Sequence, residues 1–273
     1  MSKPVTIEWV NHASFVLAYG EVRLICDPWL FGSAFNNGWD LLCATRFTAD
    51  DFRDITHIWF SHEHPDHFSP PVLRQIPEDV RTGITVIFQE TKDRKVIDFC
   101  RSLGFGVQEL PNHKWLTLAL EFRVMCGKVP FFDSWLFVDA GGTKVLNIND
   151  CVVDGDGVAS EIAKHTGAVD LLLTQFSYAN WLGNPEDVDI RKEAAAEKLE
   201  RVKIQIDTFA PKQTIPFASF VYFSHEENVY LNDEVNTVHR AAEFIASQSA
   251  SEPVVLYPGD HWIVGEAHDN EAR

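Results

Sequence analysis

The chain of 273 residues is long enough for one large α/β domain, and its 45% hydrophobic content can fill a sizeable core. A formal net charge of −17 would repel nucleic acid phosphates and anionic lipid surfaces, so neither nucleic acid nor a membrane is expected as a partner. The longest apolar runs are far shorter than the roughly 20 residues of a membrane-spanning helix, and the N-terminus shows no basic-then-apolar leader, so we expect a cytoplasmic protein.

The N-terminal part is predicted to begin with strands joined by tight turns. Segments rich in β-branched and aromatic residues predict strands at Val5–Val10, Ser14–Ala18 and Val22–Cys26. Thr48 is placed to cap a short helix just before an apolar strand at Ile55–Phe60. A segment rich in histidine follows that strand directly.

The rest of the chain predicts alternating helices and strands. Helix signals cover Pro70–Gln75, Lys92–Leu103 closed by Gly104, Val158–Thr166 and much of Arg191–Thr208. Strand signals cover Ile84–Phe88, Phe122–Cys126, Trp135–Val138, Lys144–Ile148, Leu171–Thr174 and a final strand near Thr214–Val221. The alternation predicts a layered α/β fold. Because no repeat, low-complexity stretch or linker divides the chain, we expect one domain over residues 1–273.

The histidine-rich segment has the side chains of a metal site. Three histidines and an aspartate lie within six residues after a predicted buried strand: His62, His64, Asp66 and His67. In an extended chain, His62 and His64 point the same way and can reach one ion. Asp66 and His67 are adjacent and are expected to diverge, which directs the loop toward a second ion. Because imidazole and carboxylate together suit zinc, iron and manganese, the segment predicts a site for two transition-metal ions.

This His-x-His-x-Asp-His spacing resembles the motif of the metallo-β-lactamase superfamily. The resemblance implies a four-layer αβ/βα sandwich with the metals at one edge of the two sheets. It also implies a later aspartate that bridges both ions, and Asp150, at the end of the predicted strand Lys144–Ile148, fits that position. Asp66 is then expected to be a catalytic group as well as a ligand.

Further segments resemble the lactamase-like domain of the CMP-N-acetylneuraminate hydroxylases, in the same order and over nearly the whole chain. They are Asn11–Phe15, Cys26–Leu30, Ala34–Phe35 with Gly38–Trp39, Val145–Asn147 with Asp150–Cys151, and Pro216–Ala218 with Ser224–His225. Those hydroxylases also have a Rieske iron–sulfur half, for which none of the five cysteines supplies the Cys-x-His pair. Oxidative chemistry would therefore need electrons from elsewhere.

Two positions depart from the hydrolases of the superfamily. The stretch Gly127–Pro130, before the expected bridging aspartate, holds no histidine, and Phe217–Ala218 replaces a later one. His225 follows soon afterwards and matches a histidine of the hydroxylase-like branch. We therefore expect His225 to be a ligand and a catalytic group, with His113 and His261 as the alternatives.

Other residues are expected around the metals. His12 and Asp27 each follow an N-terminal strand and resemble family positions beneath the ions, where Asp27 can accept the second N–H of a ligating imidazole. The alternatives are a hydrogen-bonded core histidine and a turn aspartate. Two loops rich in asparagine and aromatic residues are expected to line a substrate pocket through Asn37, Trp39 and Tyr178.

Two functions fit these features. The first is a non-heme iron oxidase or oxygenase that acts on a small polar metabolite, with O₂ and an external electron donor as further partners. The missing hydrolase histidines favour it. The second is a hydrolase of phosphoesters, lactones or amides, in which zinc or manganese carries an activated hydroxide. A non-catalytic metal-binding scaffold is a third. The same ligands serve zinc and iron, so iron is favoured while both chemistries stay open.

Overall fold

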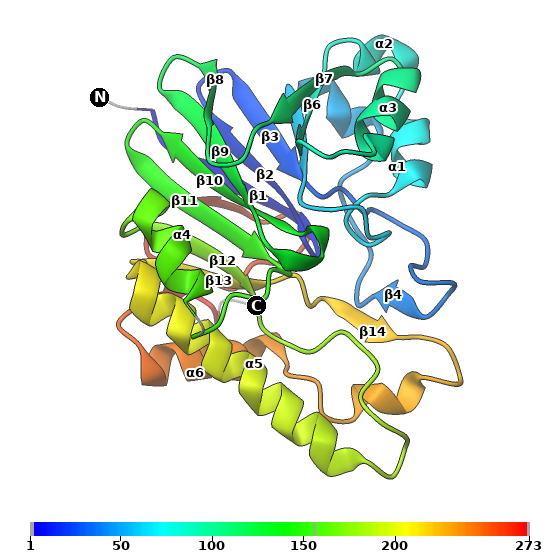
Figure 1. The fold of residues 1–273 in the computed structure, drawn as a ribbon, viewed down its shortest axis with the longest axis vertical. Helices are drawn as coiled ribbons and strands as arrows, with labels where there is room; N and C mark the ends of the chain where they lie inside the picture. The colour runs from blue at the N-terminus through cyan, green and yellow to red at the C-terminus, as the bar shows by residue number, and fades with distance from the viewer. Residues whose placement is uncertain (1–2, 156, 272–273) are drawn as a thin grey trace.

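Strands of the chain pack into two sheets that lie face to face (Figure 1). The computed structural model describes residues 3–155 and 157–271. In this part of the chain the first sheet has the order β16-β1-β2-β3-β5-β6-β7. Its strands are β1 (Thr6–Asn11), β2 (Ser14–Tyr19), β3 (Val22–Cys26), β5 (His57–Phe60), β6 (Thr85–Gln89), β7 (Gly106–Leu110) and β16 (His261–Ile263). The associated helices are η1 (Asp50–Asp54), α1 (Pro70–Gln75), α2 (Glu78–Arg81) and α3 (Lys95–Ser102).

The second sheet has the order β15-β13-β12-β11-β10-β9-β8 within the same described residues. Its strands are β8 (Trp115–Ala119), β9 (Phe122–Lys128), β10 (Ser134–Ala140), β11 (Thr143–Asn149), β12 (Leu171–Gln175), β13 (Gln213–Phe217) and β15 (Glu252–Pro253). Its helices are η2 (Pro130–Phe132), α4 (Val158–Thr166), α5 (Val188–Phe209), η3 (Val229–Asn232) and α6 (Val238–Gln248). A small antiparallel ribbon pairs β4 (Trp39–Leu41) with β14 (Val221–Phe223).

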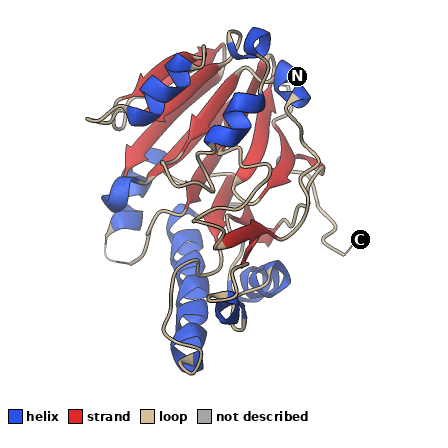
Figure 2. Ribbon diagram, turned by 90° about the vertical axis from the view of Figure 1, so that its right-hand side faces the viewer, coloured by secondary structure: helices blue, strands red, loops and turns tan. Residues whose placement is uncertain are grey.

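The two sheets follow the same plan. Each starts with antiparallel strands, β1-β2-β3 and β8-β9-β10-β11, and continues with parallel strands, β3-β5-β6-β7 and β11-β12-β13. Crossover helices connect parallel strands and cover the outer faces of the sheets (Figure 2). The long helix α5 reaches beyond the strands of its sheet (Figures 1 and 2).

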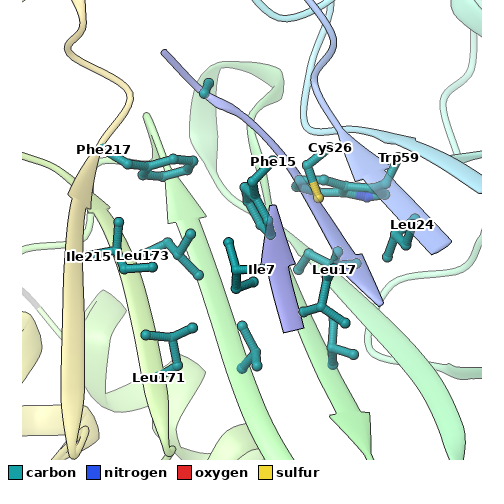
Figure 3. Close-up of a cluster of buried hydrophobic side chains, with 14 of the residues drawn as sticks. Ile7, Phe15, Leu17, Leu24, Cys26, Trp59, Leu171, Leu173, Ile215 and Phe217 are labelled. Carbon is teal, nitrogen blue, oxygen red and sulfur yellow. The ribbon is translucent and has the colours of Figure 1, made fainter. Parts of the chain in front are cut away.

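Alternation along the strands divides the core into three layers. In β2, Phe15 and Leu17 face the second sheet, whereas Val16 packs with the outer helices. Leu171 and Leu173 of β12 meet this inner layer from the other side (Figure 3). A third cluster packs the outer face of the second sheet against α4, α5 and α6. The predicted four-layer αβ/βα sandwich is therefore confirmed.

Two expectations about the strands were incomplete. The strand expected near Thr214–Val221 is divided into β13 and β14, and it is not the last, because α6, β15 and β16 follow. β16 closes the edge of the first sheet, where His261 to Ile263 pair with Thr6 to Glu8. A strand of three residues carries too little alternation to be predicted. Among the described helices, none combines the length and the apolar character needed to cross a bilayer.

Candidate metal centre

The end of β5 is held at the edge of both sheets by hydrogen bonds. The backbone N–H of Ser61 donates to Asp27 Oδ1 at 2.7 Å, which joins the ends of β3 and β5. The carbonyl of Ser61 accepts from Ser134 Oγ at 2.7 Å, at the start of β10. It also accepts from Gln89 Nε2 at 3.3 Å. The loop that begins here is thus fixed to the first sheet and to the second.

The loop of residues 62–67, called here the His62–His67 loop, turns its side chains into this edge. His62, Asp66 and His67 are buried, whereas His64 lies exposed at the rim. His62 Nε2 and His64 Nδ1 are 2.8 Å apart, but His64 is in neither group of described side chains that are close enough to hold an ion, so its ligation stays a prediction. The rings of His62 and His67 lie tilted by 43° to each other, with centroids 4.2 Å apart.

Asp66 and His67 converge, and the expectation that they diverge is wrong. The backbone forms a turn in which the N–H groups of His67 and Phe68 both donate to the carbonyl of His64. In this turn Asp66 Oδ2 lies 3.4 Å from His67 Nε2. Asp66 Oδ2 also lies 3.3 Å from His12 Nε2. The prediction assumed an extended chain, in which neighbouring side chains point in opposite directions. The turn at residues 64–68 brings the two side chains to the same side instead.

His67 stands at the centre of the cluster. Its Nδ1 lies 3.0 Å from Asp27 Oδ2, the contact expected of an aspartate behind a ligating imidazole. Its Nε2 lies 3.2 Å from Asp150 Oδ2. Among the described residues, two groups of three side chains are close enough to hold an ion, and both contain His67: one adds His12 and Asp66, the other His62 and Asp150. His12 thus stands among the candidate ligands rather than only beneath them.

Three residues of this edge have a left-handed backbone without being glycine. They are His12 (φ 42°), Asp27 (φ 41°) and Asn149 (φ 41°), which immediately precedes Asp150. Histidine, aspartate and asparagine adopt this conformation more often than other residues with a side chain, although it is uncommon outside glycine. Asn149 is held by its own side chain, whose Nδ2 donates to the carbonyl of Ser134 at 2.9 Å. Left-handed residues thus form the turns by which β1, β3 and β11 lead into the cluster.

Asp133 also faces the cluster, although it was not predicted. It is 8% exposed, and its Oδ1 lies 3.7 Å from His62 Nδ1. It comes just before β10 and only a few residues after Gly127–Pro130, where a histidine was sought and not found. Carboxylates also bind metals, so an aspartate close to the place of the missing histidine could have indicated Asp133 as a ligand.

Burial and neighbouring charges shift the pKa values of the side chains in this cluster. Burial and the charge of His67 lower the pKa of His62 to about 3. Burial alone would lower the pKa of His67, but the carboxylates of Asp150 and Asp66 outweigh it and hold that pKa well above its usual value. Burial and the neighbouring Asp150 raise the pKa of Asp133 to about 7. The edge therefore holds a surplus of buried negative charge, which a metal ion would neutralise.

Unpartnered atoms show that the residues fit metal ions. Four of the buried polar atoms that lack a hydrogen-bond partner in the described structure belong to this cluster: Oδ1 of Asp66, of Asp133 and of Asp150, and Nδ1 of His12. Such atoms are costly in a protein interior unless something binds them. Carboxylate oxygens and imidazole nitrogens together are a donor set for iron, zinc or manganese.

A cavity of about 460 Å³ adjoins these carboxylates. It is lined by Phe35, Trp39, His64, Asp66, Asp133, Asp150, Gln175, Ala179, Asn180, Trp181, Lys198, Phe223, Asn228 and Leu231. A larger space of about 820 Å³ beside Glu63 and Phe132 is lined by none of the predicted ligands, so the smaller one belongs to the site.

The three residues expected to line the pocket have different surroundings. Trp39 lines the cavity. Tyr178 is buried in an apolar cluster, where its hydroxyl donates to the carbonyl of Leu231 at 2.6 Å. Asn37 is exposed, and its carbonyl accepts from Ser224 Oγ at 3.1 Å. The structure brings neither Tyr178 nor Asn37 to the cavity wall, because Phe35 and Trp181 of the same loops take those places.

The structure does not bring His225 into either group of candidate ligands. It is exposed in the loop between β14 and η3, where its Nδ1 accepts from the backbone N–H of Glu227 at 3.2 Å. The alternatives lie elsewhere too: the His113 ring packs against that of His165, with centroids 3.9 Å apart, and His261 is exposed on β16. Ligation by His225 stays a prediction.

Comparison with known proteins agrees with this geometry. Residues 6–125 match the beta-lactamase superfamily domain. The cytidine monophosphate-N-acetylneuraminic acid hydroxylase of Danio rerio is 28% identical over an alignment of 256 residues that covers 88% of this chain and 42% of the hydroxylase. The chain therefore spans less than half the length of the curated relatives that it matches.

Solved structures extend the likeness to nearly the whole chain. The diiron β-hydroxylase CmlA from Streptomyces venezuelae superimposes with a TM-score of 0.65 at 16% identity, covering 96% of this chain and 54% of that one. A metallo hydrolase from the archaeon Ignicoccus hospitalis also gives 0.65, at 12% identity, covering 96% and 99%. The predicted resemblance is thus confirmed: residues 6–125 match a beta-lactamase superfamily domain, and the chain has the metallo-β-lactamase fold.

Proposed function

We propose that this chain is a metal-dependent enzyme that holds two transition-metal ions where its two sheets meet. The ligands are the His62–His67 loop, Asp150 and Asp133, with His12 or His225 completing the set. The convergence of carboxylates on buried imidazoles, with one oxygen of each of three aspartates unpartnered, carries this proposal. Because each sheet supplies part of the set, we also propose that residues 1–273 act as one domain.

The residues around the ligands orient them. Asp27 accepts the Nδ1–H of His67, which directs Nε2 toward Asp66 and Asp150. Ser61 Oγ lies 2.8 Å from His62 Nδ1 and fixes that ring in turn. Ions bound here would polarise a substrate bond and activate O₂ or water. Asp66 and Asp133 line the cavity and would exchange protons with a substrate there.

We favour oxidation of a small polar metabolite by iron and O₂, with electrons from the substrate or a separate donor. The donor set supports this, because Gly127–Pro130 lacks the histidine of the hydrolases and a carboxylate, Asp133, follows a few residues later and faces the cluster. A set richer in carboxylate shifts preference from zinc toward iron and manganese. The similar proteins from Danio rerio and Streptomyces venezuelae are both hydroxylases, which agrees with this choice.

Hydrolysis is the second candidate. In its favour, this chain aligns with 99% of the length of the archaeal metallo hydrolase, so the two proteins have nearly the same extent. A fold of this extent thus suffices for a hydrolase, whereas CmlA is aligned over 54%.

Metal exchange tests the two candidates. Protein purified without chelator is assayed for iron, zinc and manganese, then stripped and reloaded anaerobically with Fe(II) or Zn(II). We expect near-stoichiometric metal, and oxidation of the Fe(II) protein by O₂ that speeds up when candidate polar acids are added. Cleavage of ester, lactone or phosphoester substrates by the Zn(II) protein without O₂ would replace oxidation with hydrolysis. Failure to retain any of the three metals would refute the metal centre itself.

A further inference from the structure

One lysine shares the cavity with the carboxylates of the metal centre. Lys198 lies on α5 and lines the same space of about 460 Å³ as Asp66, Asp133 and Asp150. Of the described residues that line this cavity, Lys198 alone is a lysine or an arginine. In a chain with a formal net charge of −17, a cation at this place is unexpected.

Lys198 lacks an anionic partner among the residues that the structure describes. Its ammonium donates to the neutral amide oxygen of Gln175, and it has no ion pair with a carboxylate within 4.0 Å. Other lysines of α5 are paired, since Lys192 lies 3.4 Å from Asp189 and Lys203 contacts Asp207. A half-buried charge normally has a partner of opposite charge. An anionic group bound in the cavity beside Lys198 would be such a partner.

The ammonium stays mostly charged at neutral pH. Burial and the neighbouring Arg201 lower the pKa of Lys198, to about 8, while Asp150 and Asp133 act in the opposite direction. These two carboxylates attract the ammonium without pairing with it, because they face the metal centre instead. The positive charge is thus free for a molecule that enters the cavity.

We propose that Lys198 is the anion-binding residue of the substrate site, and that the substrate is a small molecule with a carboxylate or phosphate group. This inference rests on the proposed function, since the same cavity would hold the substrate beside the metals. A cavity of about 460 Å³ suits a small metabolite. Trp181, which lines it with 67% of its surface exposed, offers an indole face to the rest of that molecule.

The test measures binding of simple anions by calorimetry. Full-length protein, metal-free and Zn(II)-loaded, is titrated with benzoate, with inorganic phosphate and with neutral benzamide. The variants are Lys198→Gln, Lys198→Arg and, as a matched control on the same helix, Lys192→Gln. Loss of a hydrogen-bonded ion pair predicts at least about a tenfold weaker affinity of Lys198→Gln for both anions. Lys198→Arg should stay within about threefold of the unaltered protein, because it keeps the charge.

Three further readouts decide the outcome. Benzamide affinity and metal content should be unchanged in Lys198→Gln, and Lys192→Gln should behave as the unaltered protein. Equal anion affinity in Lys198→Gln, or no saturable binding of either anion by the unaltered protein, overturns the inference. Metal loss in Lys198→Gln also overturns it, because Lys198 would then be a counter-ion of the ligands. Lys198-dependent anion binding in a protein that takes up no metal supports the inference and refutes the proposed function.

Discussion

The two sheets have one strand plan but contribute to the metal centre in different ways. The first sheet delivers a contiguous segment, the His62–His67 loop, at the end of β5. The second delivers single residues, Asp133 before β10 and Asp150 after β11. A contiguous segment can be recognised from spacing alone, whereas single residues gain their meaning only when the sheet brings them together. The first sheet therefore makes the site predictable, and the second adds the carboxylates that favour one chemistry over another.

The largest effect is expected from the residue that both groups share. His67→Ala should weaken metal affinity by more than about 10–100-fold, which is the usual effect of removing a residue that only hydrogen-bonds a ligand. The reason is that His67 contacts Asp27, Asp66 and Asp150 together. Metal analysis after reconstitution measures the change. His57→Ala is the control, because that half-buried ring, on the strand β5 that leads into the loop, hydrogen-bonds Thr56 and belongs to neither group of candidate ligands. Full metal content in His67→Ala would show that the first sheet is not the main source of ligands.

Removing the partner behind His67 should have a smaller effect. Asp27→Asn keeps the shape of the side chain but loses the charge that orients the imidazole. We expect metal affinity to fall about 10–100-fold, as is usual for such partners. Competition with a chromophoric chelator gives the affinity. Arg23, on the strand β3 that ends just before Asp27, pairs with Glu8 outside the site, so Arg23→Gln is the control. An Asp27→Asn protein with unaltered affinity would mean that packing alone holds His67.

Asp133 provides a test of the second sheet through pH. Its pKa is about 7 in the absence of metal, and metal binds the deprotonated form. Below pH 7, protons therefore compete with metal at Asp133, and apparent affinity falls as the pH drops. Asn cannot titrate, so Asp133→Asn should bind more weakly at pH 8, by about tenfold, but lose less affinity between pH 8 and pH 6. His67 also takes up protons in both proteins, so their difference isolates Asp133. Parallel pH profiles would remove Asp133 from the metal centre.

Much of the fold could be predicted because its central strands are strongly apolar. The missed strands lie at sheet edges: β7 buries only Leu110 fully, and β8 has exposed and half-buried residues throughout. An edge strand needs little apolar surface, so its periodicity is weak. The helix α6 was missed because Ala241 and Ala242 form part of its buried face, and alanine gives little hydrophobic contrast.

In the candidate site, sequence reasoning failed where a residue type has a more ordinary use. Lys198 belongs to a charged helix, in which lysine normally faces water. Asp133 is the one residue between η2 and β10, and aspartate is common in such connections. His12 was left open between a ligand neighbour and a core residue, because only the fold shows that β1 ends beside Asp66. Each of these meanings depends on contacts that are distant in sequence.

The smallest expected effect on metal concerns how firmly β10 sets the position of Asp133. Gly127 of β9 pairs with Trp135 of β10, and a Cβ added to Gly127 would lie 2.0 Å from the Trp135 ring. Gly127→Ala should therefore displace a buried tryptophan and lower the free energy of unfolding by about 1–3 kcal/mol, the usual cost of overpacking. Urea denaturation of the metal-free protein measures it. Gly83→Ala, whose Cβ would lie 3.5 Å from its nearest neighbour, should change stability by less than about 0.5 kcal/mol.

The same variant, Gly127→Ala, tests whether metal affinity depends on this packing. If the tryptophan moves without shifting Asp133, metal affinity should stay within about threefold of the unaltered protein, since contacts of Ser134 with Ser61 and Asn149 hold the start of β10 independently. Unchanged stability would instead mean that β10 yields easily, and that the second sheet positions its carboxylate less rigidly than the first positions its histidines.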